Sequence, residues 1–400
     1  MEFFRNTSID FLGKKWYFLA FSLIFSVAGV FSMLFWHGIP LGVDFRGGTL
    51  VTVKYAHPPD AAKIHSELEA AGLKNARVQP SANNEVLIAL DIQQTSEQDL
   101  TKGKEQIKQV LAGPTASANA GKFDLNNSSS LGLANYLLEK DPLHLSTDAN
   151  PRYTAIAQGI VDQKDKVRGG VLGSIDELNG IADPAVLASL KAGAFTSDFG
   201  VRDVAIVGPQ VGQQLRRQAW LATLYSLAGM LVYLGLRFEW IYGVAAVLTV
   251  FHDTLITVGA FSLLNWEISL TVIAAILTLI GYSNNDTIVV FDRIRENIKL
   301  LRRDKLADIV NKSINQTLSR TILTAGLTFL TVLALFLFGG EVLHGFSFAL
   351  VIGILIGTYS SIAIAAPILV AYQEWRAGRG QQPISMPVRT GNGQKEKVKA

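Results

Sequence analysis

A carboxylate stands inside a stretch whose composition is otherwise that of a membrane span. Asp286 follows Ser283, Asn284 and Asn285, and the residues just before them, 268–279, are almost entirely apolar. An ionised aspartate near the centre of a membrane helix costs about 2.5–3.5 kcal/mol on insertion scales, so it usually faces a bundle interior and has a partner. Asp286 is therefore a candidate proton-binding residue.

Two further charged residues lie in neighbouring apolar runs. Asp253 follows His252 in one run, and Arg320 opens another. At 1.5 Å of rise per residue, Asp253 and Asp286 are expected to differ by about 9 Å in depth, too far for direct contact but within reach of a relay through water. Arg320 is a candidate counter-charge for Asp286. Because burial opposes charge on a carboxyl group and a guanidinium favours it, a carboxylate between these influences can load and release a proton.

Threonines follow Arg320 at spacings that place them on one helical face: Thr321, Thr324, Thr328 and Thr331. Such a stripe more often packs against another helix than forms a conduit. We expect Asn285, Thr324 and Thr328 to contribute a polar face within the membrane. The competing interpretation of Asp286 is structural, with its side chain capping a kink or fixing the packing of neighbouring helices.

Composition supports a membrane protein and excludes several other classes. Of 400 residues, 49% are hydrophobic and 17% are charged, and the mean hydropathy is +0.28; soluble domains carry about 25% charged residues. A net charge of +3 implies no nucleic-acid partner. Without cysteine the chain has no disulfide, thiolate or cysteine-based metal site. The sequence contains no phosphate-binding loop and no H-E-x-x-H motif, so we expect no catalytic residues, no metal and no cofactor other than protons.

Six apolar runs are long enough to cross a membrane. They are residues 16–36, 219–236, 241–264, 268–291, 321–338 and 342–372. The first run is longer than the roughly 7–15 apolar residues of a signal peptide, so it is expected to remain as an anchor. The last run is expected to tilt or to end early.

The distribution of Lys and Arg gives the orientation. Basic residues gather in the N-terminal segment 1–15, in the connection at about 292–320 between the fourth and fifth spans, and in the tail 373–400. The turns at 265–267 and 339–341 contain none. By the positive-inside rule both termini are cytoplasmic, and the long segment 37–218 lies outside.

The outside segment alternates between strand and helix patterns. Strands are predicted at 49–55, 76–80, 86–90 and 201–207, and helices at 59–71 and 97–111. The order βαββαβ predicts a ferredoxin-like α+β domain. Between its last helix and last strand, residues at about 113–199 are expected to form an inserted helical subdomain or a partly mobile loop. The predicted fold class is therefore a polytopic α-helical membrane protein with six transmembrane helices and a ferredoxin-like domain between the first two.

Two glycine-bearing motifs join the outside segment to the membrane: GVDFRGGTL at residues 42–50 and GPQVGQQLRRQAW at residues 208–220. The residues assigned to this joint are Asp44, Gly47, Gly48, Gly208 and Gly212. The simpler interpretation is a turn at the entrance to the outside domain. The functional interpretation is a pivot that couples the domain to the bundle, since hinges are commonly a few residues at the ends of elements.

Five motifs together resemble a known family. They are GVDFRGGT after the first run, VGPQVGQQLRRQA before the second, FHDTLITVGAFSLL in the third, IGYSNNDTIVVFDRIREN in the fourth, and LSRTILTAGLTFL with LFGG in the fifth. They are similar to the SecF family of the SecDF protein-export accessory complex, within the resistance-nodulation-division superfamily. The resemblance covers all six runs and the outside domain. The segment at about 113–199 is a departure, since it is larger than expected for the family.

The resemblance implies a function that the residue spacing alone does not. Members pair with SecD and, together with YajC and YidC, assist the SecYEG channel in the bacterial inner membrane, using the proton motive force to promote export of a translocating polypeptide. By motif match, Asp286 corresponds to the family's intramembrane aspartate and Arg320 to its partner arginine. Asp253 matches a polar family position with a less settled role.

Two other classes of function fit parts of the sequence. A proton-driven small-molecule exporter of the same superfamily usually has twelve spans and two outside domains, so this chain would need a partner that supplies the other half. A scaffold subunit without a proton role would tolerate replacement of Asp286 by asparagine.

Overall fold

The computed structural model describes residues 7–73, 76–81, 83–90, 105–113, 118–145, 149–238, 240–301 and 304–379. The features predicted at residues 1–6, 97–104 and 380–400 lie outside this range. Within it, six helices are long and apolar enough to cross a membrane: Lys15–Trp36, Pro209–Arg237, Trp240–Leu264, Leu270–Leu300, Leu306–Phe338 and Val342–Arg376. The prediction of a polytopic helical membrane protein is confirmed.

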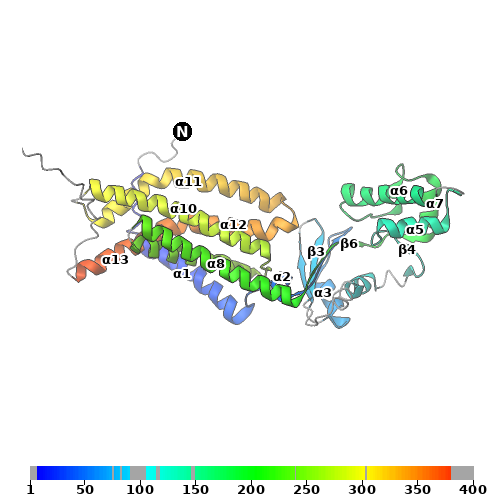
Figure 1. Ribbon diagram of the computed structural model, residues 1–400, viewed down its shortest axis with the longest axis horizontal. Helices are drawn as coiled ribbons and strands as arrows, with labels where there is room; N and C mark the ends of the chain where they lie inside the picture. Colours follow the sequence, from blue (N-terminus) through cyan, green and yellow to red (C-terminus); the bar gives the residue numbers. More distant parts are fainter. Residues whose placement is uncertain are drawn as a thin grey trace, which may run out of the picture.

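The spans pack as one elongated bundle (Figure 1). Its elements are α1 (Lys15–Phe31) with the π-helical η1 (Ser32–Trp36), α8 (Pro209–Arg237), α9 (Trp240–Leu264), α10 (Leu270–Leu300), α11 (Leu306–Phe338), α12 (Glu341–Ser360), the π-helical η4 (Ser361–Ala365) and α13 (Ala366–Gly378). Helices satisfy every backbone polar group internally, which lipid requires of a single-chain span. The end of the bundle that carries α13 lies opposite the end that meets the sheet (Figure 1).

The structure corrects one expectation about the bundle and excludes one of the two alternatives for the last run. The segment predicted as a connection at about 292–320 is helical for most of its length, because α10 runs to Leu300 and α11 already begins at Leu306. Ile294 and Ile314 of these extensions are buried in a common core, which stabilises the helices beyond the apolar runs. The last span does not end before residue 372; it continues to Gly378 through the π-helical turn η4.

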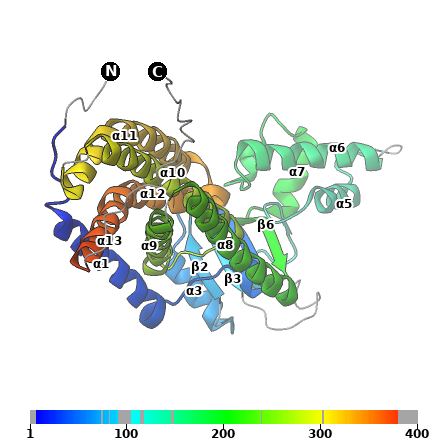
Figure 2. The same ribbon diagram turned by 60° about the vertical axis from the view of Figure 1, so that its left-hand side comes forward.

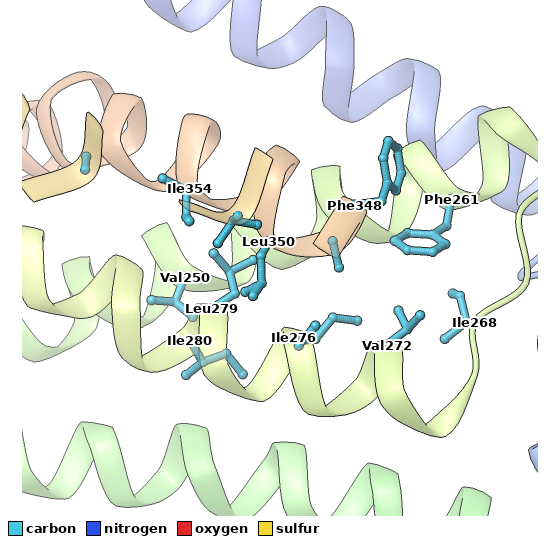
Figure 3. Close-up of a cluster of buried hydrophobic side chains, with 14 of the residues drawn as sticks. Val250, Phe261, Ile268, Val272, Ile276, Leu279, Ile280, Phe348, Leu350 and Ile354 are labelled. Atoms are coloured by element: carbon cyan, nitrogen blue, oxygen red, sulfur yellow. The ribbon is translucent and has the colours of Figure 1, made fainter. Parts of the chain in front are cut away.

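The bundle has two apolar cores at different depths. The core nearer the sheet includes Phe261 of α9, Val272 and Leu279 of α10, and Phe348 of α12. Figure 3 shows these side chains pointing toward one another from the three helices. The second core includes Tyr242 of α9, Ile294 of α10 and Ile314 of α11. The cores separate along α10, where the first ends at Ile280 and the second begins at Val290.

The outside domain contains the predicted four-stranded sheet. Its strands are β1 (Gly48–Tyr55), β2 (Ala76–Pro80), β3 (Glu85–Leu90) and β6 (Phe199–Val207), in the order β2-β3-β1-β6 with all neighbours antiparallel. Helix α3 (Ala61–Ala70) and a helix over residues 105–113 supply Ile64, Leu68 and Ile107 to the domain core. This strand order is the one expected when two βαβ units share an antiparallel sheet, so the α+β prediction is confirmed.

The inserted segment folds around a core of its own. It contains α5 (Ser130–Lys140), α6 (Ala149–Asp162) with the π-helical η2 (Gln163–Val167), η3 (Ile175–Leu178) and α7 (Pro184–Gly193). The parallel strands β4 (Phe123–Asp124) and β5 (Ala194–Phe195) close its base. Tyr153 is fully buried at the centre of this core, and its hydroxyl group donates to Asp141 Oδ1 at 2.8 Å. Of the two expectations for this segment, its described residues match the helical subdomain. It projects away from the bundle beyond the sheet (Figures 1 and 2).

Candidate functional site in the membrane bundle

Along α10, α11 and α12, a layer of buried polar residues lies between the two apolar cores, and two buried residues of α9 join it. The layer contains Asp253 and Thr257 of α9, Ser283, Asp286 and Thr287 of α10, Thr317 and Thr321 of α11, and Ser360 of α12, all buried. A polar group inside a membrane bundle must find partners within the protein, because lipid offers none. In this layer, a side chain must therefore offer hydrogen-bond partners to its neighbours as well as fit the available space.

Asp253 is the hub of this layer. Its side chain is fully buried, and Oδ2 accepts hydrogen bonds from the hydroxyl groups of Ser283 at 2.6 Å and Ser360 at 2.8 Å. These donors come from α10 and α12, so one carboxylate ties three helices together. Gly357 lies one turn before Ser360, and a Cβ atom there would lie 3.0 Å from Ser283 Cβ. The absence of a side chain at Gly357 allows this close approach.

The network extends to α1 through a histidine. His252 Nδ1 lies 3.0 Å from Asp253 Oδ1, and its Nε2 contacts the hydroxyl group of Ser22. If Nδ1 carries a proton and donates it to the carboxylate, Nε2 is an acceptor for the serine hydroxyl. A continuous hydrogen-bonded path thus runs from α1 to α12 across the bundle.

Asp286 lies one helical turn from this path. It is three residues after Ser283, or about 4.5 Å along the axis, and it is only 4% exposed. Its Oδ2 atom is buried and makes no hydrogen bond to any described residue. Buried side-chain oxygens with no partner are uncommon, and a carboxylate oxygen in this position is suited to holding a proton.

Arg320 approaches Asp286 without forming a close pair. The described residues contain no ion pair between them within 4.0 Å, although Arg320 is near enough to act on the carboxyl group by Coulombic interaction. Arg320 is exposed on the outer surface of the bundle, as are Asn285 and Thr324, and Thr328 is half-buried. The hydroxyl groups of both threonines donate to backbone carbonyls one turn earlier in α11.

Of the residues proposed for proton coupling, the structure brings Asp253 and Asp286 into one layer and leaves Arg320 at its surface. Ser283, one turn before Asp286 on α10, donates to Asp253, a contact that sequence analysis did not identify. Ser22, His252 and Ser360 were also missed. The only signals were the position of His252 beside Asp253 and a pair of serines, residues 360 and 361, that interrupts the last apolar run.

The joint residues divide into two groups. Asp44, in the short helix α2 (Val43–Arg46), accepts a hydrogen bond from the backbone N–H of Leu270 at 2.8 Å. A Cβ atom on Gly47 would lie 2.8 Å from Pro209 Cα, and one on Gly212 would lie 3.0 Å from Gly47 N. Both glycines are therefore required for close packing of α2 against α8. A Cβ atom on Gly208 would meet no other atom within 4 Å, and Gly48 has a φ angle of +140° that favours glycine.

Comparisons with known proteins give a consistent result. Residues 187–375 match the family model described as "Protein export membrane protein SecD/SecF, C-terminal", and residues 34–59 match "SecD/SecF GG Motif". The chain is 64% identical over 408 residues to the protein translocase subunit SecF of Koribacter versatilis, covering 100% of both chains. That match includes the inserted segment. It is 37% identical over 380 residues to the subunit of the same name from Calditerrivibrio nitroreducens, covering 94% of this chain and 98% of the relative.

Solved structures show the same similarity. The crystal structure of SecDF, a translocon-associated membrane protein from Thermus thermophilus, matches with a TM-score of 0.64 and 30% identity over 92% of this chain. A SecDF structure in a super-membrane-facing form matches with a TM-score of 0.54 and 30% identity. The chain spans about two-fifths of each of those longer chains, 39% and 40% respectively.

Proposed function

The chain belongs to the SecF family of protein translocase subunits, and we propose that it uses a proton gradient, through Asp286, to drive polypeptide export as part of the Sec pathway. It is a multi-pass membrane protein and an accessory subunit for protein translocation. The proton coupling is supported by one observation above the others: a carboxylate that is 4% exposed, with one oxygen without a partner among the described residues, in a polar layer between two apolar cores.

A SecD subunit is the expected partner within the membrane. The SecDF chains include a region homologous to this chain and are more than twice as long. The face of α11 that carries exposed Arg320 and Thr324 also carries exposed Leu327. An arginine at membrane depth is costly against lipid and usually faces protein or water. We propose that SecD covers this face and places polar groups opposite Arg320, and that the pair works with SecYEG, YajC and YidC on the translocating polypeptide.

The location follows from the same family and from charge. We place the protein in the bacterial inner membrane, with the sheet and the inserted helices on the periplasmic side and both termini in the cytoplasm. Lys14 precedes the first span and Lys15 begins it. Arg237 lies at the end of the bundle opposite the sheet, where it approaches Asp292 at 3.9 Å. Basic residues at this end satisfy the positive-inside rule.

The free energy that one proton supplies can shift the bundle between two states that already differ little. A charge that crosses the full field at 100 mV contributes about 2.3 kcal/mol. Inverting a two-state equilibrium from 1:99 to 99:1 takes about 5.5 kcal/mol. One proton at Asp286 therefore shifts an existing equilibrium, and cycles of loading and release move the bundle repeatedly between arrangements that already differ little in free energy.

Dependence on the gradient tests the proposal directly. In inverted vesicles that contain the Sec channel, an uncoupler should slow the later stage of preprotein translocation when this chain and SecD are present. Vesicles from a strain depleted of this chain, matched for channel content, should show the same slow rate with and without uncoupler. The measurement is protease protection of a labelled preprotein over time. Equal uncoupler sensitivity in the two vesicle preparations would contradict the proposal.

Asp253 invites a separate prediction about its role. Asp253→Asn keeps a carbonyl oxygen that can accept from Ser283 and Ser360. Asp253→Ala removes the acceptor of the buried Ser283 hydroxyl, at about 1–3 kcal/mol, and leaves Ser360 only the carbonyl of Gly357 at 3.1 Å. If Asp253 is a hydrogen-bonding hub, we expect the Asn variant to retain gradient-dependent export and the Ala variant to lose membrane-inserted protein. Thermal unfolding in detergent and the vesicle assay measure the two effects. Loss of export in a fully stable Asn variant would instead make Asp253 a second proton site.

A further inference from the structure

The outside domain is connected to the bundle at two separate places with different properties. At the first, α2 and the turn between α9 and α10 form a fixed base. Ile268 N donates to Pro40 O at 2.7 Å, Gly42 N donates to Ile268 O at 2.9 Å, and Asp44 accepts from Leu270 N. Backbone bonds and a cap on the exposed N–H groups of α10 hold this base to the membrane helices.

Two adjacent strand ends connect the outside domain to this base. Gly48 opens β1 and is paired with Val207 at the end of β6, and Gly208 follows at once. Gly47 and Gly212 are packed tightly into the base. A rotation of the outside domain would therefore change the backbone torsion angles mainly at Gly48 and Gly208. These two glycines lie side by side where both chains cross between base and sheet, which is the geometry of a hinge with one axis.

The second place of contact contains an ion pair at the opposite edge of the sheet. Nη1 of Arg77, in the edge strand β2, lies 3.0 Å from Oε1 of Glu267 in the turn before α10. The same nitrogen donates to Leu41 O at 3.2 Å. The Arg77 and Glu267 side chains are 28% and 20% exposed. Strand β2 is separated from β6 by β3 and β1, so this contact is as far from the hinge strand β6 as the sheet allows.

We propose that Arg77 and Glu267 are positioning residues that form a releasable latch. The closed latch holds the outside domain against the bundle, and its release lets the domain swing about Gly48 and Gly208. The proposal rests on the proposed function, because the gradient supplies the work that opens the latch. A partly exposed ion pair contributes little to stability. A contact of this strength suits a switch, since a single proton step can break it.

The latch is tested by the position of the domain in the full chain with SecD. Spin labels on cysteines at Ser66 of α3 and Leu264 at the end of α9, both exposed, report the distance between domain and bundle; the chain has no native cysteine. We expect two distances whose populations shift when a gradient is imposed. Arg77→Ala and Glu267→Ala should each change the ratio of the two populations about two- to fivefold toward the longer distance without a gradient. The exchanged pair, Arg77→Glu with Glu267→Arg, should return the ratio toward that of the parent.

A purely structural role predicts different results. If the pair only stabilises the turn, the alanine variants lower the unfolding temperature and leave the population ratio unchanged, and the exchange restores nothing; this result would overturn the latch. The outcome is separable from the proton proposal. A single distance under all conditions, with export still dependent on the gradient, would refute the latch and leave Asp286 as the coupling residue. A matched control, Lys63→Ala, removes an exposed ion pair with Glu67 inside α3 and should leave the ratio unchanged.

Discussion

Replacing Asp286 with asparagine should abolish the gradient-dependent stage of export while the chain remains folded and inserted. Asparagine has nearly the same shape and keeps a hydrogen-bonding side chain, so the polar layer is preserved, but the amide cannot bind and release a proton. Because Asp286 Oδ2 has no partner among the described residues, the substitution breaks no hydrogen bond that this oxygen makes there. In the vesicle assay, we expect the rate with a gradient to fall to the rate measured with an uncoupler.

The controls separate loss of coupling from loss of structure. Asn285→Ala changes the neighbouring exposed position and should have a much smaller effect. Arg320→Leu should resemble Asp286→Asn if the two charges act as a unit, and the double variant should then be no worse than either single one. An Asp286→Asn variant that keeps the uncoupler sensitivity of the parent would refute the assignment and favour a scaffold role.

The features that could be predicted from sequence are those governed by local rules. Six spans follow from runs of apolar residues, because lipid forces each run to satisfy its backbone as a helix. The sheet follows from alternation in segments such as 49–55, and its strand order follows from the βαββαβ sequence of elements. Asp286 was identifiable because a carboxylate in an apolar run is costly whatever surrounds it.

The features that were missed depend on how distant helices are rotated against one another. Serines are inexpensive in membrane helices, so Ser22 carries no signal and the serine pair 360–361 only a weak one. Only the fold brings Ser22 to His252 and Ser360 to Asp253. The cap from Asp44 to Leu270 joins residues 226 positions apart. The extensions of α10 and α11 beyond the apolar runs were missed because Ile294 and Ile314 are separated by charged residues in sequence and come together only in the second core.

A reversible clamp between the outside domain and the turn before α10 should stop the same stage of export by a different route. Gln79 of β2 and Asn265 line one crevice between the domain and the bundle, beside Glu267. Cysteines at these two positions can be joined by a bifunctional methanethiosulfonate and released by reductant. If the domain must move away from the bundle for the gradient to act on polypeptide, we expect the joined protein to retain ATP-driven translocation and to lose acceleration by the gradient.

Two comparisons make the clamp decisive. Joining cysteines at Lys63 and Glu67, which lie one turn apart in α3, leaves the domain free and should have no effect. Capping Gln79 and Asn265 cysteines singly controls for the cost of replacing Asn265, whose φ angle of 53° is unfavourable for other side chains. Recovery on reduction should be complete, because the cross-link changes only the range of domain positions. Full gradient-dependent export in a protein whose Gln79–Asn265 cross-link has been verified would show that the domain does not swing, and Gly48 and Gly208 would then serve only as the turn by which the chain enters and leaves the sheet.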